Sequence, residues 1–198
     1  MTLDNYRTHA KVYLDPVVAV AIRLGLTPNF FTIAAFLASA AAGFLFFFRL
    51  ELLAVLAVAA NAVCDALDGA VAREMKIQSV RGDFLDHAVD RYADIFIITG
   101  IFAGGLVCWQ IGVFALTGVL MSSYLGTQAQ AVGVGRYYGG ILGRADRRVL
   151  IIVIGIINIL VPAGIFGVTF LTYLLLCFGI FGHITAFQRF VYVWRKVE

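Results

Sequence analysis

Six apolar runs, each about as long as a bilayer-spanning helix, constrain the fold of this chain more than any other feature. A transmembrane helix needs about 20 predominantly apolar residues to cross about 30 Å of hydrocarbon. Of the 198 residues, 62% are apolar, which exceeds the share of about half that is usual in soluble domains. We therefore predict an all-α integral membrane protein with six transmembrane helices. They are expected near residues 30–48, 52–72, 84–106, 107–132, 148–165 and 167–190.

The segment before the first apolar run has a different pattern. Residues 4–24 mix apolar side chains with basic ones, which is typical of an amphipathic helix that lies in the membrane interface. Thr27 can cap the helix that follows, and Pro28 suits its first turn. We predict a single domain over residues 1–198, with a juxtamembrane helix at 1–25 and a six-helix bundle at 26–198.

Basic residues predict the orientation in the membrane, because they concentrate in the cytoplasmic connections of membrane proteins. In a six-span arrangement Arg49 falls on one side. On the other side fall Arg7, Lys11, Arg23, Arg73, Lys76, Arg81, Arg136, Arg144, Arg147, Arg148, Arg189, Arg195 and Lys196. We expect a multi-pass protein of the cell membrane with both termini in the cytoplasm. Membrane lipids are expected among its partners, and nucleic acid is not.

Only 14% of the residues are charged, and the acidic ones gather in one short stretch. Asp65 and Asp68 are three residues apart, so on a helix they share a face with two small residues, Gly69 and Ala72. A second stripe of carboxylates recurs at every fourth position. It comprises Asp86, Asp90 and Asp94, and Asp83 precedes it by three residues.

Ionised side chains inside a membrane bundle are costly unless they are paired or solvated, so the two carboxylate stripes predict a cation. Hard carboxylate oxygens, with His87 as the one nearby imidazole, favour Mg²⁺ or Mn²⁺. Two helices that each offer a pair of aspartates can hold two ions near the cytoplasmic surface. The spacing alone is equally compatible with metal-assisted catalysis and with a proton or cation relay in a transporter.

The complete pattern resembles the signature of the CDP-alcohol phosphotransferase (CDP-alcohol phosphatidyltransferase) family. It consists of Asp65-x-x-Asp68-Gly69-x-x-Ala72-Arg73, eight residues, and then Gly82-x-x-x-Asp86-x-x-x-Asp90. The resemblance implies an enzyme that moves the lipid phosphate of a CDP-lipid to the hydroxyl of a small alcohol and releases CMP. It also implies a homodimer, because members of the family commonly form one.

The resemblance also assigns roles to the residues of the signature. It implies that Asp65, Asp68 and Asp86 bind the metal ions and that Asp90 is both the general base and a further metal ligand. Gly69 and Ala72 would leave room for the nucleotide, while Arg73 would meet its CDP end. Neutralising a pyrophosphate and deprotonating an acceptor hydroxyl are the two chemical needs that these residues meet.

A cluster of arginines precedes the fifth apolar run and bears on the acceptor. Arg144, Arg147 and Arg148 have helical spacing, so their guanidinium groups can bind a phosphate together or simply anchor the span. Arg144 and Arg147 are similar to the Arg-x-x-Arg pair that binds the phosphate of inositol phosphate in phosphatidylinositol-phosphate synthases and their archaeal counterparts, so the resemblance implies that they bind the acceptor phosphate. Those enzymes usually carry a basic residue where this chain has Gly126 and Gln128. We expect a phosphorylated polyol, inositol phosphate first and glycerol 3-phosphate as the alternative; a transporter is the remote alternative.

Overall fold

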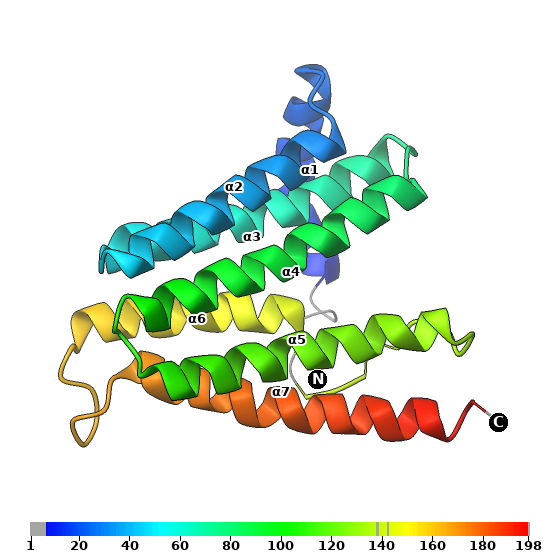
Figure 1. Ribbon diagram of the computed structural model, residues 1–198. Helices are drawn as coiled ribbons and strands as arrows, with labels where there is room; N and C mark the ends of the chain where they lie inside the picture. Colours follow the sequence, from blue (N-terminus) through cyan, green and yellow to red (C-terminus); the bar gives the residue numbers. More distant parts are fainter. Residues whose placement is uncertain (1–6, 138, 142, 198) are drawn as a thin grey trace.

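Seven helices and no β-sheet make up the part of the chain that the structure, a computed structural model, describes (Figure 1). That part comprises residues 7–137, 139–141 and 143–197, and the side chains of residues 7–13, 144 and 145 lie outside the description. The helices are α1 (Arg7–Arg23), α2 (Pro28–Phe47), α3 (Glu51–Glu74), α4 (Val80–Ala103), α5 (Trp109–Ala131), α6 (Arg144–Leu160) and α7 (Phe170–Trp194). The predicted all-helical class is confirmed, and α2 to α7 correspond to the six apolar runs.

Two helices begin four residues earlier than the apolar pattern predicts, because polar residues cap them. Ser79 accepts a hydrogen bond from the backbone N–H of Gly82, so α4 starts at Val80 rather than near residue 84. The Asp146 carboxylate accepts one from the N–H of Gly143, and α6 consequently includes the arginine cluster in its first turns. The polar connection between α3 and α4 is therefore shorter than the sequence suggests.

Four helices of the described residues are long and apolar enough to cross a membrane: α2, α3, α5 and α7. The other two counterparts of the apolar runs fall short for different reasons. In α4 the first half carries the acidic stripe, whereas α6 has 17 residues and a charged first turn.

Close helix packing places α2 between α3 and α4. A Cβ atom at Gly100 of α4 would lie 2.1 Å from the backbone oxygen of Gly43 on α2, so these two backbones touch and only glycine fits. A second close pair, α5 and α7, meets in the same way at Gly118 and Gly182. The two groups are joined by α6, which packs against both α3 and α7, and by the contact of α4 with α5.

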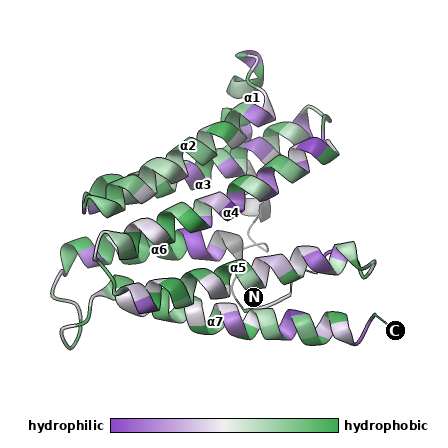
Figure 2. Ribbon diagram, viewed as in Figure 1, coloured by the Kyte–Doolittle hydropathy of each residue, from purple (hydrophilic) through white to green (hydrophobic). Residues whose placement is uncertain are grey.

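The connections lie at two opposite ends of the bundle (Figure 1). Those that follow α2, α4 and α6 share one end, where the Arg49 side chain donates a hydrogen bond to the carbonyl of Gly104. The connections that follow α3 and α5 lie at the other end with the C-terminus. In Figure 2 the hydrophilic residues of α3 and α4 gather toward this second end. The end with the C-terminus is therefore where polar substrates can approach.

The N-terminal helix α1 uses its apolar side to pack on the bundle. Val18 and Ala21 are buried in a small cluster with Phe31, Leu67 and Val71. This contact places α1 against the half of α3 that carries the aspartates. The predicted position of α1 in the membrane interface and the division at residue 25 remain predictions.

Candidate active site

The centre of the candidate site is a group of three carboxylates from two helices. Asp65 and Asp68 on α3 and Asp86 on α4 each offer one oxygen, and these oxygens lie within 4.8 Å of one another. The helical spacing of Asp65 and Asp68 puts both on one face, and α2, which packs against α3 and α4, holds the two helices at the distance that their carboxylates bridge. The tertiary structure brings together the three aspartates that the sequence predicts as metal ligands.

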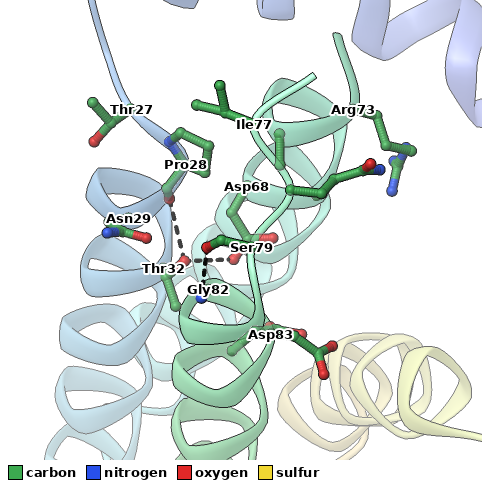
Figure 3. A pocket seen from close by; sticks show the side chains of 14 residues that line it. Thr27, Pro28, Asn29, Thr32, Asp68, Arg73, Ile77, Ser79, Gly82 and Asp83 are labelled. Carbon is green, nitrogen blue, oxygen red and sulfur yellow. Dashed lines mark hydrogen bonds between the residues drawn. The ribbon is translucent and has the colours of Figure 1, made fainter. Parts of the chain in front are cut away.

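Asp68 is the most enclosed of the three. Its side chain is 7% exposed, and its Oδ2 accepts a hydrogen bond of 2.9 Å from the hydroxyl of Thr32 on α2. Thr32 is itself buried, and the Pro28 carbonyl lies within hydrogen-bonding distance of the same hydroxyl (Figure 3). Thr32 was not among the residues that the sequence singles out, because its pairing with Asp68 depends on how α2 packs on α3.

The imidazole of His87 does not join the carboxylates through Nδ1. This nitrogen lies 2.7 Å from the carbonyl oxygen of Asp83, and a carbonyl only accepts, so Nδ1 carries a proton and donates it. The nearest Asp86 oxygen is 3.7 Å away. The donors that cluster among the described residues are the carboxylates of Asp65, Asp68 and Asp86. Hard oxygen donors of this kind fit Mg²⁺ or Mn²⁺ rather than zinc or copper.

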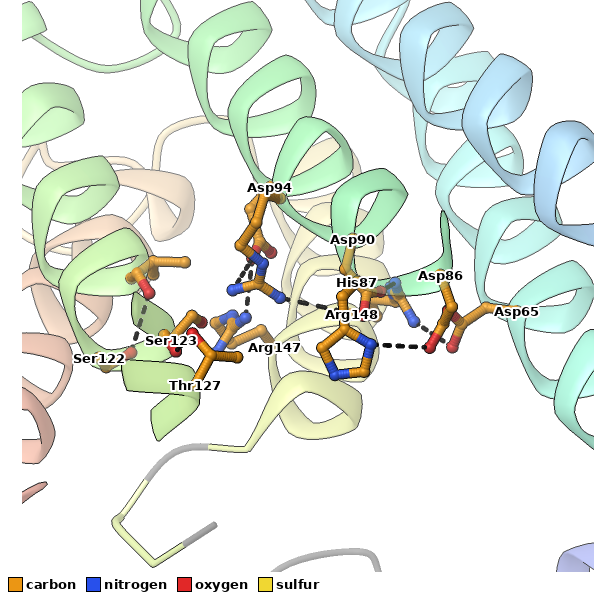
Figure 4. Close-up of polar contacts among 12 residues, drawn as sticks. Asp65, Asp86, His87, Asp90, Asp94, Ser122, Ser123, Thr127, Arg147 and Arg148 are labelled. Carbon is orange, nitrogen blue, oxygen red and sulfur yellow. Dashed lines mark hydrogen bonds and ion pairs between the residues drawn. The ribbon is translucent and has the colours of Figure 1, made fainter. Parts of the chain in front are cut away.

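Asp90 lies one turn beyond Asp86 on α4 and is 1% exposed. Its Oδ1 accepts a hydrogen bond of 2.6 Å from Arg148, whose other terminal nitrogen is 2.5 Å from Oδ2 of Asp65 (Figure 4). One guanidinium from α6 thus links the predicted base to a predicted metal ligand. The sequence places Arg148 in the arginine cluster but does not indicate this bridge.

Arg147 occupies a second ion-paired group next to Arg148. Its guanidinium is almost completely buried and donates to Asp94 at 2.9 Å, and Arg91 lies 3.3 Å from the same oxygen of Asp94. The Nε of Arg147 is buried without a hydrogen-bond partner among the described residues. Arg147 therefore lies inside the bundle instead of pointing out of its mouth, while the side chain of Arg144 lies outside the described residues.

A cavity of about 500 Å³ opens beside two of the three carboxylates, and Figure 3 shows the residues that line it. Asp68 and Asp86 line it, and so do Gly69, Ala72 and Arg73, the residues that the sequence connects with the nucleotide. A Cβ atom at Gly69 would lie 3.1 Å from Nη1 of Arg73, so a larger residue there would crowd that side chain. The rest of the lining comes from the start of α2 and the α3–α4 connection: Thr27, Pro28, Asn29, Thr32, Ile77, Gln78, Ser79, Gly82 and Asp83.

The space beside Gly126 on α5 contains a basic residue from another helix. A Cβ atom at Gly126 would lie 2.5 Å from Nη1 of Arg189 on α7. Arg189 donates to the carbonyl oxygens of Ser122 and Gly139, at 2.5 and 2.8 Å. Where related enzymes carry a basic residue on α5, the space beside Gly126 is thus filled by Arg189 from α7. The sequence pattern could not show this, because the two residues are far apart in the chain.

Comparison with known proteins agrees with this geometry. The sequence model of the CDP-alcohol phosphatidyltransferase family matches residues 25–188. The chain is 36% identical over 172 residues to the archaetidylinositol phosphate synthase of Pyrococcus horikoshii, which covers 87% of this chain and 91% of that protein. It is 31% identical over 196 residues to the enzyme of the same name from Methanothermobacter thermautotrophicus, which covers 99% of this chain and 96% of that protein.

Solved structures of one enzyme share the fold. The crystal structure of Mycobacterium tuberculosis phosphatidylinositol phosphate synthase with CDP-DAG bound has a TM-score of 0.76 and 26% identity, covering 90% of this chain and 92% of the other. The structure of the same enzyme in complex with manganese and citrate has a TM-score of 0.77 and 26% identity, covering 90% and 88%.

Proposed function

This chain belongs to the CDP-alcohol phosphatidyltransferase family, and we propose that it transfers the lipid phosphate of a CDP-lipid to a hydroxyl of inositol phosphate, releasing CMP. The observation that carries this proposal is the group formed by Asp65, Asp68 and Asp86 at the edge of a cavity lined by Gly69 and Arg73. The family makes the chain an enzyme of phospholipid synthesis. The choice of inositol phosphate is supported by the two archaeal relatives and by the mycobacterial enzyme, whose names state that product class.

In the proposed mechanism the three carboxylates hold Mg²⁺ or Mn²⁺, with Asp90 as a further ligand and two ions in all. Divalent ions supply charge neutralisation at a pyrophosphate and at the oxygens that attack and leave. The cavity takes the cytidine end of the donor, where Gly69 and Ala72 leave room and Arg73 faces the nucleotide. These assignments follow the family signature, and the cavity beside the carboxylates supports them.

Asp90 is proposed to remove the proton from the acceptor hydroxyl. The hydroxyl oxygen then forms a bond to the lipid-side phosphorus, the bond from that phosphorus to the bridging oxygen breaks, and its electron pair leaves on CMP. Asp90 is suited to this task because α4 and Arg148 hold its carboxylate in one place.

In the membrane we propose that α2 to α7 are six spans and that α1 lies in the interface. The site would face the cytoplasm together with both termini. This arrangement is supported by the basic residues, since Arg73, Lys76, Arg81 and Arg136 flank the connections at the site end, whereas Arg49 lies at the opposite end. A homodimer is retained as a proposal from the family.

The test of the proposed function is a panel of acceptors. Purified enzyme with Mg²⁺ and a CDP-lipid should release CMP fastest with inositol phosphate, and more slowly with glycerol 3-phosphate, free inositol or serine. A clear preference for glycerol 3-phosphate would assign the chain to that branch of the family. Preference for an unphosphorylated alcohol would contradict the acceptor assignment.

Removal of divalent metal is expected to stop turnover. Without ions the clustered carboxylates repel one another and the pyrophosphate of the donor. The measurement is CMP release after metal stripping with excess EDTA, followed by addition of Mg²⁺ or Mn²⁺ to restore it. Full activity in the chelated enzyme would contradict a metal-dependent reaction.

Arg147→Ala is expected to raise the acceptor KM by about ten- to a hundredfold, with a smaller effect on the KM of the CDP-lipid. A charge-assisted hydrogen bond to a phosphate is worth about 1.5 to 3 kcal/mol, and the Nε of Arg147 is a buried donor that has no partner within the described part of the chain. The measurement is a pair of KM determinations, one for each substrate. Arg144→Ala is expected to act in the same direction.

The exposed Arg195, which directly follows the last residue of α7, supplies the control for charge loss. Arg195→Ala removes one positive charge away from the site and should leave both KM values unchanged. If Arg147→Ala, while folded, keeps the acceptor KM of the parent enzyme, Arg147 is an ion-pair partner of Asp94 only.

A further inference from the structure

The bridge formed by Arg148 is a feature that the family signature does not contain. The guanidinium comes from the fifth residue of α6 and is paired with one carboxylate from α3 and one from α4. Its partners are 83 and 58 positions away in the sequence. Arg148 thus makes two ion pairs that connect three helices within the site (Figure 4).

The burial of the three residues shows that this is not a surface ion pair. The side chains of Arg148 and Asp90 are 12% and 1% exposed. That of Asp65 is 26% exposed and belongs to the group of three carboxylates. Removing a guanidinium from water is costly, and two short charge-assisted hydrogen bonds offset that cost. A residue that merely anchored α6 at the membrane surface would keep its charge in water.

The geometry of the bridge depends on the shape of the arginine head group. Two terminal nitrogens of one planar guanidinium reach two different carboxylates, Nη1 to Asp65 and Nη2 to Asp90. A lysine ammonium is a compact point charge on a flexible stem and does not hold two acceptors in a fixed relative orientation in this way. Substitution of Arg148 can therefore separate two effects: lysine keeps the positive charge but loses the fixed orientation of the two carboxylates, and glutamine loses the charge.

We propose that Arg148 is a positioning residue that serves as the built-in counter-ion of the metal site. Its two terminal nitrogens hold the carboxylate of the base Asp90 in a fixed position relative to that of the metal ligand Asp65. Its positive charge touches the carboxylate of Asp65 and repels a divalent cation bound there. The affinity of the three carboxylates for free metal is therefore kept low. The inference rests on the proposed function for the role of Asp90, but the effect on metal affinity does not depend on which acceptor is used.

The test compares three variants of the full-length enzyme in detergent or nanodiscs: Arg148→Gln, Arg148→Lys and the control Arg195→Gln. The first readout is the Kd of Mn²⁺ without nucleotide, taken from the electron paramagnetic resonance signal of free Mn²⁺. The second readout is the rate of CMP release at saturating substrates and metal. Arg195→Gln removes the same charge from an exposed position and should match the parent enzyme in both readouts.

The expected result separates the two roles. Arg148→Gln should bind Mn²⁺ about tenfold more tightly, because a positive charge next to the ligands is gone, and its turnover should fall by about ten- to a hundredfold. Arg148→Lys should keep the Mn²⁺ affinity within about threefold of the parent, because the charge is retained, and should still lose turnover.

Either of two results would overturn the proposal. One is a folded Arg148→Gln protein that binds Mn²⁺ no more tightly than the parent enzyme. The other is an Arg148→Lys protein with unchanged turnover, and this variant decides the question by itself if Arg148→Gln does not fold. If no acceptor on the panel supports CMP release, the proposed function fails, while the Mn²⁺ titrations still decide the role of Arg148.

Discussion

Asp68→Asn is expected to lower the rate of CMP release by about a hundred- to a thousandfold, with the protein folded and extractable from the membrane. Asp68 is the most buried of the three clustered carboxylates, so its charge has the least solvent screening and the largest effect on a bound cation. Asparagine keeps the shape of the side chain and can still accept from Thr32, but it removes the charge. The loss of turnover would thus report on metal binding rather than on packing.

Two controls accompany Asp68→Asn. Asp15→Asn removes a carboxylate from an exposed position on α1 and should leave turnover unchanged. A titration with Mn²⁺ should show weaker binding in Asp68→Asn and parent-like binding in Asp15→Asn. Asp65→Asn should behave like Asp68→Asn, and wild-type turnover in both would exclude the assigned ligand role.

Asp90→Asn is expected to reduce turnover by about a hundred- to ten-thousandfold, the range attributed to general acid–base catalysis. Binding of CDP in the presence of metal should survive better than in Asp65→Asn, because nucleotide binding needs the ions but not the removal of a proton. The measurements are single-turnover CMP release and a calorimetric titration with CDP. The site supports this distinction, since Asp65 belongs to the group of three carboxylates and Asp90 is held one turn away by Arg148.

If Asp90→Asn and Asp65→Asn lose CDP binding to the same extent, Asp90 is chiefly a metal ligand. A separate outcome concerns Arg148, because Asp90→Asn weakens one of its two ion pairs. Thermal unfolding of Asp90→Asn beside Asp68→Asn shows whether the bridge also contributes to stability. Comparable unfolding temperatures would show that the loss of turnover in Asp90→Asn does not come from a less stable fold.

The sequence predicted the helices because apolar runs of bilayer length have few alternatives to the helix. Helical spacing also predicted that Asp65 and Asp68 share a face, whereas the expectation that Asp86 joins them came from the resemblance to the family signature. The ends of α4 and α6 were predicted less well. Their first turns are polar and depend on the caps formed by Ser79 and Asp146, which an apolar pattern does not register.

The pairing between helices was decided only by the tertiary structure. Arg147 and Arg148 are adjacent in the sequence and project about 100° apart on α6, so the pattern could not tell which of them reaches the metal ligands. Packing of α6 against α3 directs Arg148 to Asp65 and Asp90, and it leaves Arg147 with Asp94. The contact of Thr32 with Asp68 depends in the same way on the fit of α2 to α3. Spacing along one helix determines its faces, but the distance and rotation between helices determine which faces meet, and those follow from packing of the whole bundle.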